Sequence, residues 1–279
     1  MRVRYSFSSR HTGRARDSPK NEKQREKYPD ALKKVIDMSQ IILEVLDARF
    51  IEETRNKELE NQIESLGKKI IYVVNKADLN KNIEGLPKPN AIVSCAQRRG
   101  IKNLRKMIKI FASKIEKQEE KAKVNVGIVG YPNTGKSSLI NILSGRSSAK
   151  VGAEAGFTKG IQKIKLSTGI ILLDSAGVIP GKEYSSSDSK LISKNAKVNA
   201  RSYSQIRDPE QVVSDLMLEF PGVFEENYKI DAHGDSEILL EEIGRKKNFL
   251  LKGGKVDIDR AAKIVLKDWQ EGKIMIRRR

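Results

Sequence analysis

The segment from Gly130 to Ser137, GYPNTGKS, carries the residues best suited to bind a phosphate group. Its glycines let the backbone wrap around an anion, so that successive N–H groups and the start of the next helix face it. The Lys136 side chain would reach the outer phosphates, and the Ser137 hydroxyl would bind Mg²⁺. The segment stands between an apolar run and a helical pattern, as this motif requires. The predicted ligands are Asn133, Thr134, Gly135, Lys136, Ser137 and Ser138.

A second polar segment, "VVNKADL", follows an apolar run and is suited to bind a base. The carboxylate of Asp78 can accept hydrogen bonds from both N1–H and the N2 amine of guanine, whereas adenine offers no such pair of donors. The segment "VSCA" (93–96) follows the next strand and would supply backbone N–H groups for the guanine O6. With the phosphate loop, these residues predict a guanine nucleotide as ligand. The candidates at this end are Asn75, Lys76, Asp78, Ser94, Cys95 and Ala96.

A third segment, "LLDSAG" (172–177), supplies a metal-binding carboxylate. Asp174 would hold Mg²⁺ through water, and the Gly177 N–H would contact the γ-phosphate. Thr158 in "GFTKG" would close over Mg²⁺ when GTP is present, although it can also be read as an ordinary loop threonine. The predicted metal ligands are Ser137, Thr158 and Asp174, and the predicted catalytic residues at this end are Lys136, Thr158 and Gly177.

Short apolar strands alternate with helical patterns up to about residue 180, which predicts an α/β fold: a mostly parallel sheet with helices on both faces. In the usual GTPase order the phosphate loop comes first and the NKxD segment follows DxxG. Here the NKAD and SCA segments come first. The sequence therefore predicts a circularly permuted P-loop GTPase domain, in which the basic segment 102–123 joins the former ends. Such permutation is tolerated where chain ends lie close together at the surface.

Three regions follow from these patterns. Residues 1–29 form a basic tail that cannot bury enough apolar surface to fold alone. Residues 30–180 form the permuted GTPase domain, and residues 181–279 form a small helical domain, in which Trp269 is expected in the core. The polar stretch 183–190 is expected to be a flexible joint.

The composition favours a nucleic-acid partner. Lys and Arg number 54 against 36 Asp and Glu, a formal net charge of +18 that attracts polyanions. The alternative explanations are generic solubility or a thermophile's composition, whose charges would normally balance. No apolar run approaches the roughly 20 residues needed to cross a bilayer. Cys95 is the only cysteine, so no disulfide partner exists within the chain, and a cytoplasmic protein is predicted.

The segments "VLDAR", "VVNKADL", "GYPNTGKSSLIN", "FTKG" and "ILLDSAGV" resemble the circularly permuted GTPases of ribosome assembly. The similarity covers most of residues 29–180. The end of the chain, "LLKGGKVDIDRAAKIVLKDWQEGKI", is similar to the branch of nucleolar and archaeal large-subunit assembly GTPases. The resemblance implies GTP hydrolysis coupled to maturation of the large subunit, with rRNA and the subunit precursor as partners. It implies a nucleolar location in a eukaryote, and we expect a monomer away from the particle. Two departures, Cys95 and Ala155, remove no ligand.

Valine at position 178 follows DxxG, where many signalling GTPases have the glutamine that orients water. The resemblance suggests instead a potassium ion held partly by Asn133, which is therefore a further catalytic candidate. Asn133 can also be read as a loop-stabilising amide. We expect slow intrinsic turnover that the assembly particle accelerates, and GTP-dependent ordering of residues 178–190 that moves the helical domain.

Other interpretations stay open. A small-subunit assembly GTPase would usually carry an N-terminal barrel and a Cys/His zinc module, for which this sequence has neither room nor ligands. A regulatory switch protein with a non-ribosomal partner is the other alternative. The terminal arginines, such as Arg2, Arg4 and Arg277, are candidates for RNA phosphate contacts or are solvated chain ends. Arg49 could face the nucleotide or only fix a loop.

Overall fold

A computed structural model describes most of the 279 residues. The described residues are 30–80, 83–119, 123–145, 161–174, 189–198, 200–274 and 276. Two predicted site residues, Thr158 and Gly177, lie outside them, as do the tail 1–29 and the terminal arginines 277–279.

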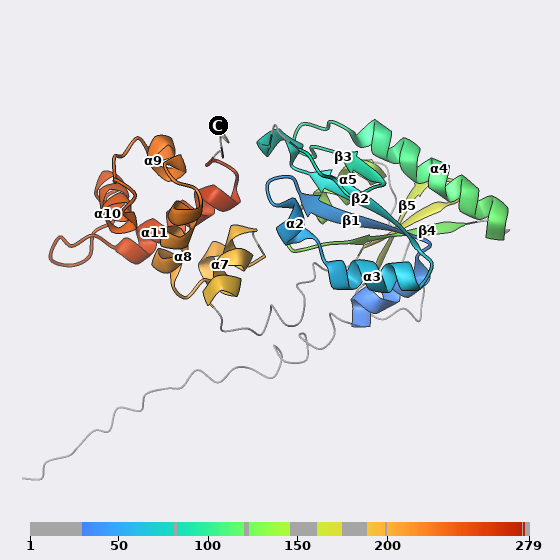
Figure 1. Cartoon of the computed structure of the whole chain (residues 1–279), viewed down its shortest axis with the longest axis horizontal. Helices are drawn as coiled ribbons and strands as arrows, with labels where there is room; N and C mark the ends of the chain where they lie inside the picture. The colour runs from blue at the N-terminus through green and yellow to red at the C-terminus, as the bar shows by residue number, and fades with distance from the viewer. Residues whose placement is uncertain are drawn as a thin grey trace, which may run out of the picture.

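Six strands in the described part of the chain form one sheet, in the order β3-β2-β1-β4-β6-β5 (Figure 1). They are β1 (Ile41–Asp47), β2 (Lys69–Asn75), β3 (Asn90–Ile92), β4 (Val124–Val129), β5 (Gln162–Ser167) and β6 (Ile170–Asp174). All neighbours pair parallel except β5, which is antiparallel to β6. The central pair of β1 and β4 joins distant parts of the chain, with Ile41 beside Val126.

Helices cover both faces of this sheet. Every residue of β1 is buried, as expected for a parallel strand with packing on both sides. Helices α4 (Ile101–Glu119) and α5 (Lys136–Ser144) pack on one face. Residues 30–38, which are helical, and α3 (Lys57–Ser65) pack on the other. The short α2 (Ile51–Thr54) follows β1, and the 3₁₀ helix η1 (Ala77–Leu79) follows β2.

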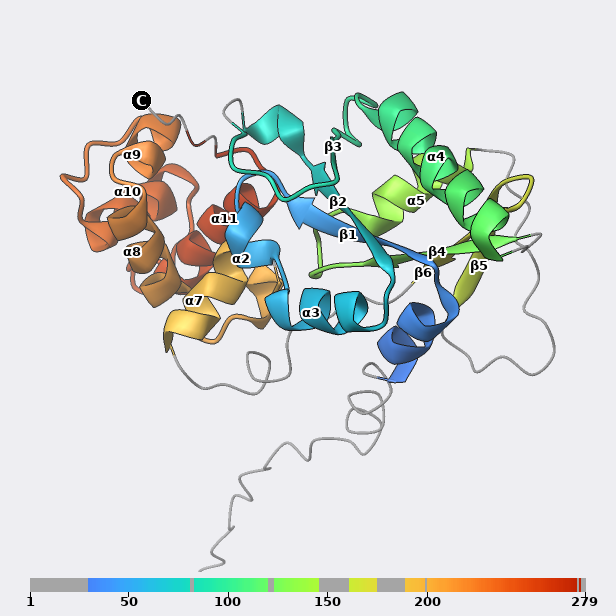
Figure 2. The same ribbon diagram turned by 45° about the vertical axis from the view of Figure 1, so that its right-hand side comes forward.

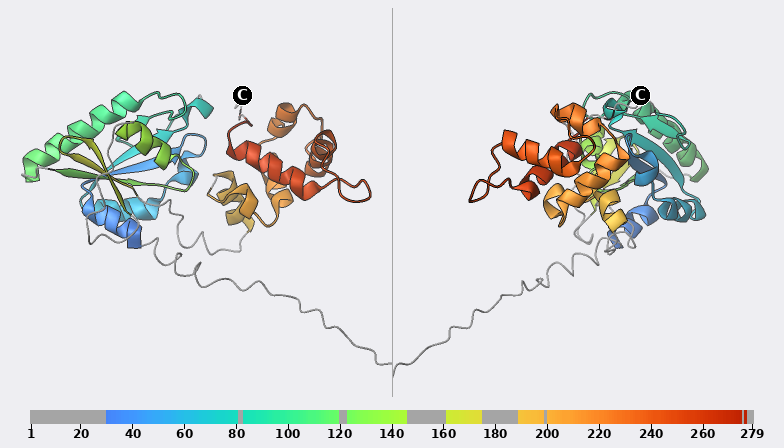
Figure 3. Two further views of the ribbon diagram at one scale, coloured as in Figure 1. Left: turned by 180° about the vertical axis from the view of Figure 1, so that it is seen from behind. Right: turned by 60° about the vertical axis from the view of Figure 1, so that its left-hand side comes forward.

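The remaining helices form a separate layer beside the carboxyl ends of the strands (Figures 2 and 3). They are α7 (Ser189–Lys197), η2 (Tyr203–Gln205), α8 (Pro209–Glu219), α9 (Val223–Tyr228), α10 (Ser236–Lys246) and α11 (Ile258–Gln270). Three of them begin at an aspartate whose carboxylate accepts from backbone N–H groups of the first turn: Asp208, Asp235 and Asp257.

The core of the helical part also takes in side chains from the sheet domain. Trp269 is fully buried and stacks on Phe224, with the ring centroids 5.4 Å apart. Phe50, from the loop after β1, lies 5.9 Å from the Trp269 ring, and Tyr131 of the phosphate loop belongs to the same cluster. The two parts are therefore joined by a continuous apolar core as well as by the chain.

The architecture confirms the predicted fold class: a mostly parallel sheet with helices on both faces, followed by helices alone. Trp269 is in the core, as predicted. Helix α7 begins at Ser189, so residues 189 and 190 of the stretch expected to be a joint are helical, and residues 183–188 lie outside the described part. None of the helices in the described part has the length and apolar character needed to span a membrane.

Candidate functional site

A cavity of about 1040 Å³ opens at the carboxyl ends of the parallel strands. Both halves of the chain line it. Its lining includes the predicted site residues Asn75, Lys76, Asp78, Cys95, Ala96, Asn133, Gly135, Lys136, Ser137, Ser138 and Asp174. The segments on either side of the permutation point, the base-reading loop after β2 and the phosphate loop after β4, thus face one common space.

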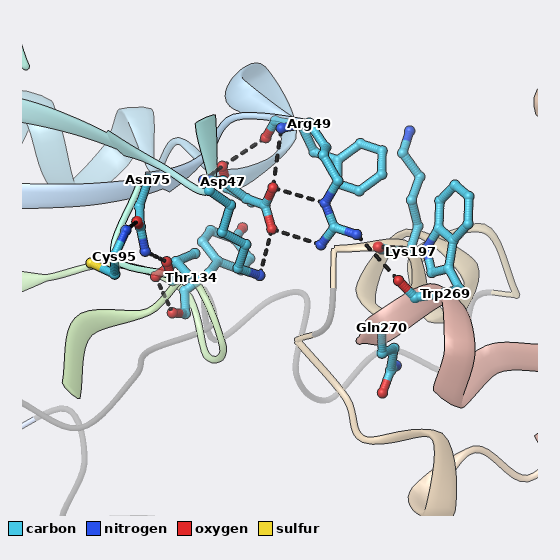
Figure 4. Close-up of polar contacts among 12 residues, drawn as sticks. Asp47, Arg49, Asn75, Cys95, Thr134, Lys197, Trp269 and Gln270 are labelled. Atoms are coloured by element: carbon cyan, nitrogen blue, oxygen red, sulfur yellow. Dashed lines mark hydrogen bonds and ion pairs between the residues drawn. The ribbon is translucent and has the colours of Figure 1, made fainter. Parts of the chain in front are cut away.

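Asn75 ties these loops together (Figure 4). Its Nδ2 donates to the Thr134 carbonyl oxygen at 2.9 Å, and its Oδ1 accepts from the Cys95 N–H at 3.1 Å. The side chain is buried, with 2% of its surface exposed. Because both ends of the amide bind protein atoms, Asn75 positions the loops that line the cavity.

Gly135 approaches this tie so closely that no side chain fits. A Cβ built there would lie 2.2 Å from Asn75 Nδ2, and the backbone has φ of +99°. We expect Gly135→Ala to separate Asn75 from Thr134 and leave buried polar groups unpaired, which costs about 1–3 kcal/mol of unfolding free energy. GTP affinity should fall as well, because the phosphate loop shifts.

Gly67→Ala is the matched control for this prediction. Gly67 also has a positive φ, +67°, but a Cβ there meets nothing within 4 Å. Both substitutions place alanine at a positive φ, so the excess loss at Gly135 measures the clash together with the less favourable φ of that position. Chemical denaturation and nucleotide titration of both variants provide the comparison. Equal losses in the two variants would contradict the prediction.

The Asp78 carboxylate is held from the side by Ser94. The Ser94 hydroxyl donates to Asp78 Oδ1 at 2.5 Å, and the Gln97 N–H donates to Ser94 Oγ at 3.1 Å. Ser94 is buried and does not line the cavity, so its side chain supports Asp78. Burial and the neighbouring Asp78 raise the pKa of Cys95 to about 11, although a hydrogen bond with Asn75 opposes this, so the thiol stays protonated near neutral pH.

Lys136 is buried under the phosphate loop. Its Nζ donates to the carbonyl oxygens of Gly130 and Tyr131, at 3.0 and 2.6 Å. Burial lowers the pKa of Lys136 to about 8, and the carboxylate of Asp174 only partly opposes this effect. Burial likewise raises the pKa of Asp174, against the attraction of Lys136. An anion in the cavity would give this ammonium a charged partner that the loop carbonyls cannot provide.

The chemistry of the lining fits a magnesium–nucleotide pair. Ser137 and Asp174 offer one hydroxyl and one carboxylate. Among the described residues no cluster of three or more His, Cys, Asp or Glu side chains could hold a metal by itself. Mg²⁺ commonly takes one or two protein oxygens and completes its shell with phosphate oxygens and water. The donor set therefore suits Mg²⁺ delivered with a phosphate ligand.

Lys76 begins a chain of charged contacts that leads out of the cavity through Asp47 and Arg49, which are labelled in Figure 4. Its Nζ lies 2.7 Å from Asp47 Oδ2. Asp47 is fully buried. Arg49 donates two hydrogen bonds to its carboxylate, from Nε to Oδ1 at 3.0 Å and from Nη2 to Oδ2 at 2.9 Å. Burial raises the pKa of Asp47, but Arg49 and then Lys76 outweigh it and hold the pKa at about 2.

Arg49 continues the chain into the helical domain. Its Nη1 donates to the carbonyl oxygen of Trp269 at 3.2 Å, near the end of α11. Arg49 does not line the cavity. Of its two predicted alternatives, the structure supports the one in which it fixes a loop, and it adds a contact between the domains.

The helical domain supplies one wall of the cavity, which the motifs did not predict. The lining residues from this domain are Ser202, Tyr203, Lys267, Gln270 and Glu271. The approach is close: a Cβ at Gly272 would lie 2.8 Å from Leu79 Cδ1, beside the base-reading loop. No local signal marks these residues, because only the tertiary fold brings them to the site.

Two predicted site residues, and one residue that was not predicted, have distinct positions at the site. Thr134 is fully buried, and its hydroxyl donates to the Tyr131 carbonyl oxygen at 2.9 Å, so its side chain shapes the loop instead of lining the cavity. Asn133 does line it and has φ of +59°, a conformation that asparagine tolerates better than most residues. Asp47, which the sequence analysis did not select, ends β1 beside Asn75.

Part of the chain matches a known family profile, and most of it is similar to known GTP-binding proteins. Residues 125–233 match the profile of the family described as "50S ribosome-binding GTPase". A GTP-binding protein of Methanocaldococcus jannaschii is 41% identical over 247 residues, which are 86% of this chain and 64% of that protein. Nucleolar GTP-binding protein 2 of Neurospora crassa is 35% identical over 255 residues, 87% of this chain and 40% of that protein. The chain thus spans less than two thirds of each relative's length.

Among solved structures, GNP-bound YlqF from T. maritima is similar in fold. The TM-score is 0.63, and the match covers 90% of this chain and 98% of that chain at 24% sequence identity. Because the match extends over both parts of the chain, the helices after the sheet belong to the shared fold.

Proposed function

We propose that the chain belongs to the 50S ribosome-binding GTPases, whose profile residues 125–233 match, and that it is a GTP-binding and GTP-hydrolysing assembly factor of the large ribosomal subunit. One observation carries the proposal. Asn75 joins the base-reading loop to the phosphate loop at the rim of a single cavity. Two segments with these chemistries can then grip opposite ends of one guanine nucleotide.

Each end of the cavity has a distinct role in this proposal. Asp78, steadied by Ser94, accepts from the guanine edge. Lys136 and the N–H groups of the phosphate loop neutralise the phosphates, which the following helix α5 also favours through its N-terminus. Ser137 and Asp174 would hold Mg²⁺, and the metal would supply charge neutralisation between the phosphates.

Hydrolysis needs a means other than a glutamine side chain, because position 178 is valine. We propose that a potassium ion near Asn133 adds positive charge where phosphoryl charge develops, and that the ribosomal particle accelerates an otherwise slow reaction. The exposed position of Asn133 at the cavity supports this role. Turnover measured in potassium and in sodium tests it. Equal rates would remove the cation from the mechanism.

The nucleotide state is proposed to bear on the helical domain. Helix α11 lines the cavity with Lys267 and Gln270, as does Glu271 directly after it, and the end of the helix receives the hydrogen bond from Arg49. A ligand that moves Lys76 would alter the partners of Asp47 and thereby the hold of Arg49 on α11. A nucleotide can shift such an equilibrium only by the difference in its affinity for the two states.

The affinity for GTP is expected to fall as the pH rises through about 8. The protonated Lys136 binds phosphate, and its pKa in the free protein is about 8, so deprotonation competes with binding above this value. The loss approaches about tenfold for each further pH unit. Calorimetry from about pH 7 to about pH 9 measures it. Lys136→Met should bind weakly without this dependence. If the GTP affinity of the wild type does not change across this pH range, the prediction is contradicted.

Sedimentation with ribosomal particles tests the assembly role. With a non-hydrolysable GTP analogue, we expect the chain to co-migrate with large-subunit precursors, whose rRNA is the proposed partner. Co-migration with small-subunit precursors would instead support the alternative assembly role, and free migration in every nucleotide state would support a regulatory switch. We propose a monomer away from the particle and a cytoplasmic site of action. In a eukaryote this site would be nucleolar, since relatives in Neurospora crassa and Saccharomyces cerevisiae are named nucleolar GTP-binding proteins.

A further inference from the structure

Helix α4 has one buried face and one basic face. Ile101, Leu104 and Ile108 pack into the core beneath the sheet. On the outer side, four cations that form two pairs spaced four residues apart line a groove together with Ile110 and Ser113. They are Lys102, Arg105, Lys106 and Lys109. The segment 101–115 contains no acidic residue, so this face has a single sign of charge.

Within the described part of the chain, the lysines of this face lack the ion pairs that Lys263 and Lys267 of α11 form with acidic residues four positions away. Within the described residues, no ion pair forms at Lys102, Lys106 or Lys109. On α11, by contrast, Lys263 pairs with Asp259 four residues away. Like charges at this spacing repel one another. An anion lying along the helix would relieve that repulsion.

Arg105 fixes the groove to the nucleotide-binding domain. Its Nη2 donates to the carbonyl oxygens of Ile142 and Leu143, at 2.9 and 2.8 Å, at the end of α5. The bonds hold α4 against the helix that begins at the phosphate loop. None of the four cations lines the nucleotide cavity, so the groove is a separate feature.

We propose that the basic face of α4 binds the sugar–phosphate backbone of RNA, an inference that rests on the proposed ribosomal function. The rise of about 1.5 Å per residue places a cation roughly every 5 Å along the helix, which forms a linear track of charge. Backbone phosphates suit such a track, whereas a protein interface is usually centred on apolar and aromatic side chains and depleted in lysine. Figures 1 and 2 place α4 on the side of the sheet away from the helical domain, so RNA bound there leaves that domain accessible.

The test compares two triple variants of the full chain. Lys102→Gln/Lys106→Gln/Lys109→Gln removes three charges from α4. Lys246→Gln/Lys247→Gln/Lys252→Gln removes three exposed charges from the helical domain. Each lowers the formal net charge of +18 by three, to +15. The probe is a fluorescent RNA duplex of about 20 base pairs, long enough for the minor-groove contacts of a compact domain. Its anisotropy is followed over a salt series with a non-hydrolysable GTP analogue present.

We expect the α4 variant to bind the duplex at least about tenfold more weakly, and its logarithmic salt dependence to become shallower by roughly two to three. The helical-domain variant should stay near wild type. Equal losses in both variants, or no loss in the α4 variant, would overturn the proposal. Loss of binding to polyglutamate with RNA binding retained would assign the face to an acidic protein segment instead. GTP titration of the wild type and both variants separates this inference from the proposed function. If the proposed function is wrong, all three proteins will fail to bind GTP. If only the RNA inference is wrong, all three will bind GTP.

Discussion

Asp78→Asn is expected to lower the affinity for GDP by a factor on the order of 10⁴ and to convert the preference from guanine to xanthine nucleotides. The carboxylate can accept from both N1–H and the N2 amine of guanine. An asparagine side chain would place its N–H₂ donor against the N1–H and N2 donors of guanine. Two donors that face each other in a buried site leave both unpaired, which is costly. Xanthine carries a carbonyl oxygen in place of the amine and would accept from that donor.

Ser94 sharpens the prediction. Its hydroxyl donates to Asp78 Oδ1, and it can donate in the same way to the carbonyl oxygen of asparagine. The amide orientation is then fixed, with its N–H₂ group toward the base. Titration calorimetry with GDP and XDP measures both affinities. Asp37→Asn, at an exposed position in the helix 30–38, is the control and should bind GDP like the wild type. A variant of Asp78 that keeps its GDP affinity would place the base elsewhere.

Arg49→Ala is expected to destabilise the protein by about 3–5 kcal/mol, because it leaves the buried Asp47 carboxylate without its main partner. The guanidinium holds both oxygens of that carboxylate and also the Trp269 carbonyl oxygen. Lys76 remains, with 20% of its side chain exposed, and cannot replace the bonds that are lost. Denaturant unfolding gives the free energy. Arg245→Ala removes an exposed pair with Glu241 and should change stability by less than about 1 kcal/mol.

The stability lost in Arg49→Ala is expected to depend on pH, because it involves the charge of Asp47. The folded pKa of Asp47, about 2, lies below the usual value of an unfolded aspartate, about 3.9. The stability that this group contributes is therefore present above about pH 4 and is lost as the pH falls toward 2. Without Arg49 the effect of burial prevails and the folded pKa of Asp47 rises. The difference between wild type and Arg49→Ala should thus be largest near neutral pH and shrink in acid. A difference independent of pH would show that packing, not charge, is responsible.

The sequence alone was sufficient to predict the sheet and most of the residues that line the cavity. Aliphatic runs such as 41–46 and 70–74 bury on both sides, and the end of each run carries the polar side chains of the site. A parallel sheet brings such ends to one edge, so local patterns were enough to predict that Asp78 and Lys136 share a cavity. Their roles toward a nucleotide remain predictions.

The residues that the helical domain adds to the cavity could not be predicted from local sequence patterns. Lys267 and Gln270 lie on an amphipathic helix whose pattern indicates only that one face is buried. That its end meets Leu79 and Arg49 depends on how Phe50 and Tyr131 enter the core around Trp269. Likewise, the sequence does not reveal that Asn75 binds Thr134 and that Ser94 binds Asp78, because these bonds require the loop geometry.

The pairing of β1 with β4 has a consequence for synthesis. Ile41 needs Val126 as its neighbour, so the inner strand of the sheet is translated 85 residues before the strand that completes it. Until β4 leaves the exit tunnel, one edge of β1 has unpaired backbone groups and its apolar side chains are incompletely covered. Nascent chains in such a state are prone to misfolding and aggregation. A permuted gene order therefore delays folding of the amino-terminal half, and this half is expected to depend on chaperones while translation continues.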